Sequence, residues 1–286
     1  MFRKLKQMFN SATEMHRAAM EFTALQLSWG LIKDKLPAGD GHPVIFYPGF
    51  MTGDAYTTTI RQCIKDKGYT VYGWDKGLNM GLDDTTAEHL RQHLKEVFDA
   101  NGGQKITLIG HSLGGIYARE LAREFPEMVR GVVTMGTPFG LMHDPAAATS
   151  EQLSRLYDLF NPGSDHLKAD DARERMLTPP PVPTTSLYSK EDGIVDWKGA
   201  LNPARKEAEN IEVHGSHLGM AFNMMTIAAV IDRLAQDPAD WKPFDRAKYA
   251  SFIFPANDTE GPLPDNPHWT SDPAKSKPMF GKKPKP

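Results

Sequence analysis

From Pro43 onward the chain alternates short apolar runs with longer amphipathic stretches. The apolar runs are rich in aliphatic and β-branched residues, as buried strands are, and the stretches between them have helical spacing. A strand that is followed by a helix and another strand needs a crossover connection, which favours parallel pairing. The alternation therefore predicts an α/β fold, a mostly parallel sheet flanked by helices. The expected strands are residues 44–47, 70–74, 106–109, 131–135, 185–188 and 211–213, and the expected helices lie near residues 55–67, 84–100, 114–125 and 217–236.

The strand spacing breaks once, between Met135 and Thr185. The interval, residues 139–183, contains two helix-like pieces and the run PPPVP, and it is too long for a simple connection. Ligands of such sheets bind outside the carboxyl ends of the strands, so an insertion at this place would cover a binding crevice. We predict a small helical cap insertion within one catalytic domain, residues 41–244.

Two further segments flank this domain. Residues 1–40 form a predicted N-terminal helical segment, because apolar residues recur at helical spacing and the first proline is Pro37. Its first nine residues, MFRKLKQMF, mix basic and apolar side chains, so the helix either packs on the domain or touches a lipid surface. Residues 245–286 form a predicted Pro-rich C-terminal tail without periodicity.

The overall charge and the cysteine content exclude several classes of protein. The 286 residues include 33 Lys and Arg against 36 Asp and Glu, so the basic excess of a nucleic-acid-binding protein is absent. Cys63 is the single cysteine, which excludes an intramolecular disulfide and favours a cytoplasmic location. No apolar run approaches the ~18 residues that a membrane-spanning helix needs.

The segment Gly110-His111-Ser112-Leu113-Gly114-Gly115 follows one expected strand directly and precedes an expected helix. A serine hydroxyl is a weak nucleophile and must be presented free of its neighbours, beside a base. A tight strand-to-helix turn does this, and glycines on either side of the serine relieve the crowding. The turn also places Ser112 at a helix N-terminus, where backbone N–H groups favour negative charge. Ser112 is therefore the candidate nucleophile.

A general base and an orienting acid are expected after the nucleophile in the order Asp, His. Asp192 lies just beyond the fifth expected strand, and Glu191 and Asp196 are the alternatives nearby. His217 lies beyond the sixth expected strand and is predicted to open the final helix. His214, the alternative base, is expected to finish the strand as a structural residue. Asp192 and His217 are thus the candidate acid and base.

The remaining candidate residues surround the predicted crevice. The first expected strand runs into a Pro-Gly turn that can aim the N–H of Phe50 at an oxyanion, with the N–H of Leu113 as second donor. An ordinary strand-ending turn is the alternative. His111 is expected to shape the pocket rather than take a proton. Apolar side chains that suit an acyl chain, with ordinary core packing as the alternative, are Phe46, Phe50, Met51, Phe139, Leu141 and Met142.

With these motifs the chain resembles the α/β-hydrolase superfamily, and within it the bacterial lipases and esterases that carry a GHSLGG turn around the nucleophile. The similarity spans residues 43–244 and includes the segments YSKEDGIVDW and GSHLGM. Pro48-Gly49 stands where the lipase loop often begins His-Gly, which is a departure from the pattern. The resemblance implies the α/β-hydrolase fold with Ser112 as nucleophile, Asp192 as acid, His217 as base, and Phe50 and Leu113 as oxyanion donors.

The predicted function is that of a serine hydrolase acting on carboxylic esters with short to medium acyl chains, or on lipids, through an acyl-enzyme. The alternatives are a thioesterase, an acyltransferase, a polyester depolymerase, or a non-catalytic binding protein on the same fold. The chemistry requires no metal and no organic cofactor. The expected partners are a small ester or lipid substrate, without nucleic acid, and a transient lipid surface touched by the N-terminal helix or the cap.

Overall fold

The computed structural model describes residues 2–140, 178–203, 205–252 and 254–255. Residues 141–177, which make up most of the predicted cap, lie outside the described residues, and so does most of the predicted tail. The cap and the tail stay predictions.

The described residues form a six-stranded sheet with the strand order β2-β1-β3-β4-β5-β6. Every neighbouring pair is parallel, as strand–helix alternation requires. The predicted α/β class, a parallel sheet flanked by helices, is confirmed. The strands are β1 (Pro43–Tyr47), β2 (Thr70–Tyr72), β3 (Ile106–His111), β4 (Val129–Met135), β5 (Thr184–Tyr188) and β6 (Ala208–Glu212).

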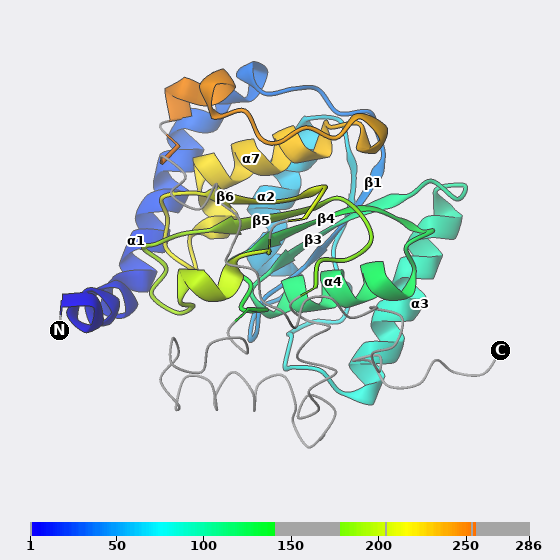
Figure 1. The fold of residues 1–286 in the computed structure, drawn as a ribbon, viewed down its shortest axis with the longest axis horizontal. Coiled ribbons are helices and arrows are strands. Elements are labelled where there is room, and N and C mark those ends of the chain that lie inside the picture. Colours follow the sequence, from blue (N-terminus) through cyan, green and yellow to red (C-terminus); the bar gives the residue numbers. More distant parts are fainter. Residues whose placement is uncertain (1, 141–177, 204, 253, 256–286) are drawn as a thin grey trace.

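Helices cover both faces of the sheet (Figure 1). The central strands are therefore apolar on both sides. In β1, Val44 and Phe46 join the core under α2 and α7, and Ile45 and Tyr47 join the core under α3 and α4. A strand buried on both faces reads as a continuous apolar run, which is why β1 was predictable to within one residue. The helices are α1 (Phe2–Ile32), α2 (Asp54–Asp66), α3 (Asp84–Ala100), α4 (Leu113–Glu124) and α7 (Met224–Leu234).

The predicted N-terminal helix is present as α1, which packs beside α2 and α7 (Figure 1). Leu25 is buried in the core that these helices share, and the indole N–H of Trp29 donates to a carboxylate oxygen of Asp66 at 2.8 Å. The outward side of α1 carries exposed apolar side chains, with Met15 75% and Leu27 78% exposed. Of the helices in the described part of the chain, α1 included, none combines the length and hydropathy of a bilayer-spanning segment. The cytoplasmic location stays a prediction.

The final helix begins later than the sequence pattern predicted. The expected helix covered residues 217–236, whereas α7 begins at Met224 because Asn223 caps it. The side-chain oxygen of Asn223 accepts the N–H groups of Met225 and Thr226, which gives the first turn its missing partners. His217 therefore lies in a loop after β6, and the prediction that it opens the final helix was wrong.

The last strand was also displaced in the prediction, which placed it at residues 211–213. Strand β6 covers Ala208–Glu212, and the polar residues Glu209 and Asn210 in its first half concealed it. Asn210 pairs with Asn202, donating to its carbonyl oxygen at 2.9 Å and accepting its N–H at 2.7 Å. An edge strand tolerates such residues because only one side of it is paired within the sheet.

The approach of α4 to the sheet depends on Gly114, where an added Cβ would overlap the carbonyl oxygen of Tyr47 in β1. We expect Gly114→Ala to lower the free energy of unfolding by about 3 kcal/mol, because the backbone must move to admit the methyl group. Urea denaturation followed by circular dichroism measures this.

Gly30 is the matched control, since an added Cβ there meets no atom within 4 Å in exposed helix α1. Gly30→Ala should raise the free energy of unfolding by about 0.5–1 kcal/mol through helix propensity alone. Equal effects of the two substitutions would contradict the close approach at Gly114.

Candidate active site

The turn between β3 and α4 holds Ser112 in an unusual backbone conformation. Its φ of 51° and ψ of −121° lie in a region that a side chain rarely adopts. The N–H of Ser112 donates to the carbonyl oxygen of Met135 at 2.8 Å, which ties the turn to the end of β4. A Cβ on Gly110 would overlap Gly114, so the turn closes only because both positions are glycine. The side chain of Ser112 stays partly exposed at the helix N-terminus.

His217 and Asp192 form a buried hydrogen-bonded pair. Nδ1 of His217 lies 2.7 Å from Oδ2 of Asp192, and both side chains are at most 4% exposed. The other oxygen, Oδ1, accepts the N–H groups of Ile194 at 2.8 Å and Val195 at 2.7 Å. These bonds fix the carboxylate, so the Asp192 side chain can orient the imidazole without turning away. The structure thus brings together the two residues that sequence order had paired.

The competing candidates are engaged elsewhere. Glu191 lies 3.1 Å from Nδ1 of His214, and both of these side chains are exposed. Asp196 accepts the N–H of Lys198 at 3.1 Å and caps a short 3₁₀-helix, Trp197–Ala200. The choice of Asp192 over Glu191 and Asp196 therefore agrees with the contacts.

The pKa of His217 is raised above its ordinary value by negative charge. Burial is the largest influence and lowers the pKa, but the charge and hydrogen bond of Asp192, helped by the charge of Glu14, outweigh it. Nδ1 thus keeps its hydrogen toward the carboxylate, which leaves Nε2 as the atom that can take and return a proton.

His111 supports the loop that carries His217. Its Nε2 lies 2.9 Å from the carbonyl oxygen of His217, and because a carbonyl only accepts, this nitrogen must carry the hydrogen. Burial, aided by the nearby His217, lowers the pKa of His111 to about 3, so the ring is neutral. The hydroxyl of Tyr56 holds the same loop by donating to the carbonyl oxygen of Leu218 at 2.6 Å. This geometry gives His111 a role in holding the loop and none in taking a proton.

The loop after β1 is held by Asn79, which is fully buried. The Asn79 side-chain amide donates to the carbonyl oxygen of Pro48 at 2.8 Å, and the N–H of Met51 donates to the Asn79 carbonyl oxygen at 2.7 Å. Across the described residues, neither the N–H of Phe50 nor that of Leu113 donates a hydrogen bond. The N–H groups of the two predicted oxyanion donors thus make no hydrogen bond among the described residues, whereas the N–H of Met51 already bonds to Asn79.

The predicted substrate-contacting residues divide into three groups. Met51 is 64% exposed and lies in the loop that Asn79 holds. Phe139 is fully buried against the guanidinium of Arg119, 3.8 Å from its ring centre, and the alternative of ordinary core packing fits it. Phe46 is core in the same way. Leu141 and Met142 lie outside the described residues.

Two residues that the sequence analysis missed are Glu14 and Glu21 of α1. Both carboxylates accept backbone N–H groups of the loop that contains His217. The available signal was their position, because Glu14 and Glu21 fall at helical spacing on the same stripe as the buried Ala18 and Leu25. A carboxylate on the apolar stripe of a helix needs a hydrogen-bonding partner.

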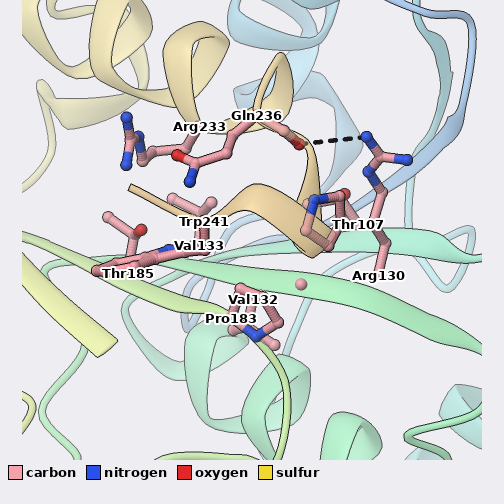
Figure 2. A pocket seen from close by; sticks show the side chains of 11 residues that line it. Thr107, Arg130, Val132, Val133, Pro183, Thr185, Arg233, Gln236 and Trp241 are labelled. Carbon is pink, nitrogen blue, oxygen red and sulfur yellow. Dashed lines mark hydrogen bonds between the residues drawn. The ribbon is translucent and has the colours of Figure 1, made fainter. Parts of the chain in front are cut away.

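The described residues contain no group of three or more His, Cys, Asp or Glu side chains that could hold a metal ion. A small cavity of about 30 Å³ opens at the opposite edge of the sheet, near the starts of β4 and β5 (Figure 2). Arg130 borders it and donates to the carbonyl oxygen of Gln236 at 3.2 Å. The cavity has room for one or two water molecules, far less than a ligand pocket, so it is not the substrate site.

Replacing Asp192 by Asn removes both the charge and the acceptor that favour protonated His217. We expect the pKa of His217 to fall in Asp192→Asn, because burial then opposes the charged ring with little compensation. NMR titration of the imidazole nitrogens measures this pKa. Glu191→Gln is the control, since Glu191 contacts His214 instead. A pKa of His217 that moves in the control, or stays unchanged in Asp192→Asn, would refute the pairing.

The chain is similar in sequence to proteins that have the same fold as the sheet described above. Residues 43–163 match the family model described as the alpha/beta hydrolase fold. Two curated relatives are triacylglycerol lipases, from Pseudarthrobacter phenanthrenivorans and Burkholderia plantarii, each 32% identical over 104 residues and 32% of this chain. The match covers 33% and 29% of those proteins, so the chain spans about a third of the length of these relatives.

Solved structures agree on the fold. Aspergillus fumigatus lipase B superimposes with a TM-score of 0.50 at 17% identity, over 70% of this chain and 55% of that chain. An identity this low speaks for the architecture alone. The parallel sheet and the match over residues 43–163 together show that the chain has the α/β-hydrolase fold.

Proposed function

We propose that the protein is a serine hydrolase that cleaves carboxylic esters through an acyl-enzyme. The observation that carries the proposal is the buried His217–Asp192 pair, at 2.7 Å, in a loop at the same sheet edge as the strained Ser112. A non-catalytic protein on this fold would have no need for a serine in that conformation together with an oriented imidazole. The lipase relatives are consistent with this class of chemistry.

In the proposed reaction, His217 acts first as a base and then as an acid. Nε2 takes the proton of the Ser112 hydroxyl as Oγ bonds to the ester carbonyl carbon. When the tetrahedral intermediate collapses, the bond to the alcohol breaks and Nε2 returns the proton to the leaving oxygen. Water then attacks the acyl-enzyme with the same help, releasing the carboxylic acid and restoring the Ser112 hydroxyl. Asp192 holds the ring and stabilises the imidazolium throughout.

The negative charge that develops on the carbonyl oxygen needs donors prepared in advance. We assign this role to the N–H groups of Phe50 and Leu113, which donate to no partner among the described residues. Leu113 is the first residue of α4, so the helix dipole adds to the stabilisation. Met51 is excluded as a donor because its N–H already bonds to Asn79.

Exposed apolar side chains favour an acyl substrate. Leu78 and Met80 flank Asn79, Met51 lies in the loop that Asn79 holds, and Ile194 donates its N–H to Asp192. Each of these apolar side chains is more than 40% exposed, which is unfavourable in water unless a ligand or surface covers it. We therefore propose esters with short to medium acyl chains as substrates, and action on emulsified lipid as the second candidate.

Ser112→Ala removes the nucleophile and should lower kcat by roughly 10⁴-fold or more. Hydrolysis of p-nitrophenyl butyrate by purified protein measures this loss, and a fluorophosphonate probe should label the wild-type protein at Ser112 alone. Ser28→Ala is the control, because the Ser28 hydroxyl bonds to the carbonyl oxygen of Ala24 within α1. Full activity of Ser112→Ala would disprove the assignment.

A series of p-nitrophenyl esters of increasing acyl length separates an esterase from a lipase. We expect kcat/KM to be greatest for short and medium chains, with no increase in rate when the substrate concentration passes its solubility limit. A sharp increase at that limit would instead favour action at a lipid interface, for which the exposed apolar side chains would then be the contact.

A further inference from the structure

Helix α1 contacts the loop that carries Asp192, although it lies outside the segment that matches the family. The Gln7 side-chain amide donates to the carbonyl oxygen of Asp192 at 3.4 Å, and the Ser11 hydroxyl donates to that of Gly193. A Cβ on Gly193 would lie 2.5 Å from the carbonyl carbon of Asn10. Glycine at position 193 therefore lets the helix backbone touch the loop directly.

Glu14 joins this loop to the loop of the candidate base. Its Oε1 accepts the N–H groups of Gly193 at 2.7 Å and His217 at 3.1 Å, and its Oε2 accepts the N–H of Leu218 at 3.0 Å. Arg17 donates to Oε1 at 2.8 Å and partly balances the charge. One buried carboxylate thus fixes the backbone of both loops whose side chains form the His217–Asp192 pair.

Glu21, two helical turns further on, holds the same loop a second time. Its Oε1 accepts the N–H of Ser216 at 2.8 Å and the Ser216 hydroxyl at 2.7 Å. Its Oε2 accepts the side-chain amide of Asn223 at 2.9 Å, and Asn223 also caps α7. The loop from Ser216 to Asn223 is therefore hydrogen-bonded both to α1 and to the start of α7.

The placement of charge on α1 argues against packing alone. Between Gln7 and Ile32 the helix has three charged residues, Glu14, Arg17 and Glu21, and both carboxylates face this loop. Burying a carboxylate is costly unless it is hydrogen-bonded, and apolar residues would attach a helix at lower cost. Glu14 also places negative charge near the imidazole of His217, which a purely apolar contact could not do.

We propose that α1 positions the candidate base, with Glu14 as a positioning residue that fixes the backbone of His217 and stabilises the protonated imidazole. The proposal rests on the function proposed above. Glu14 acts through His217, since its two oxygens are engaged by backbone N–H groups and Arg17.

The direction of the pH effect follows from the groups around His217. These are Asp192 from the loop after β5, His111 from β3, Tyr56 from α2, and Glu14, Arg17 and Glu21 from α1. The charge of Glu14 raises the pKa of His217. The base must be neutral to act, so kcat/KM rises with pH through this pKa. Removing the charge therefore moves the acidic limb of the kcat/KM profile to lower pH.

The test compares Glu14→Gln with Glu14→Asp in hydrolysis of p-nitrophenyl butyrate. We expect Glu14→Gln to lower kcat by about 10²-fold through misplacement of the base, with KM changed by less than about twofold and the acidic limb moved to lower pH. Glu14→Asp keeps the charge but cannot reach all its partners, so kcat should fall while the limb stays in place. Glu127→Gln is the control for net charge and should match the wild type. It removes an exposed carboxylate from the turn between α4 and β4.

A merely structural role of Glu14 would lower Tm and leave the kcat and the acidic limb of the folded protein unchanged, and that result would overturn the proposal. If Glu14→Gln does not fold, Glu14→Asp decides the question, and a wild-type kcat in that variant overturns it. NMR titration of His217 gives a readout independent of turnover, with a lower pKa expected in Glu14→Gln. Failure of the proposed function has a different signature, namely Ser112→Ala as active as the wild type or no ester hydrolysed by the wild type.

Discussion

The close approach of α4 to the carboxyl end of the sheet is the constraint on which the rest of the site depends. Gly114 and Gly115 leave no room for a Cβ against Tyr47 and Thr137, so the helix can start immediately after β3. The chain then has to reverse within one residue, which forces Ser112 to a positive φ. The strain is maintained because the strands and α4 bury a continuous apolar core around the turn. Packing energy from the whole domain thus holds one serine in a conformation that it would not adopt alone.

Polar contacts, rather than apolar packing, position the loops around that serine. Asn79 holds the loop after β1, His111 holds the carbonyl oxygen of His217, and Glu14 and Glu21 hold the N–H groups of the same loop. A buried polar group that loses its hydrogen-bond partner is left with its full desolvation cost, so such directional contacts specify one geometry. The division of labour is physical: the sheet supplies rigidity, and directional hydrogen bonds supply the accuracy that a proton transfer requires.

Many of the strands and the turn at Ser112 could be predicted because they depend on the residue types within short segments of the sequence. Both-face burial makes β1 a continuous apolar run and the first half of β3 largely apolar, and the glycines around Ser112 mark a tight turn. The start of α7 was missed because Asn223, rather than an apolar period, sets it. The role of Glu14 was missed because its partners lie as far as 204 residues away, and no local window contains both. Strands, helices and turns can be predicted from the sequence near them, whereas a contact between residues far apart in the sequence is seen only in the folded structure.

The long reach of α1 has a consequence for how the protein is made. Helix α1 is synthesised before the loop that its carboxylates bind, which follows some 200 residues later. The turn at Ser112 has its full set of sheet neighbours earlier, since β1, β3 and β4 precede the loop of His217. Closing so long a loop is entropically demanding and is expected late in folding. The turn of the proposed nucleophile therefore forms before the loop of the proposed base is fixed, and a partly synthesised chain carries Ser112 without His217.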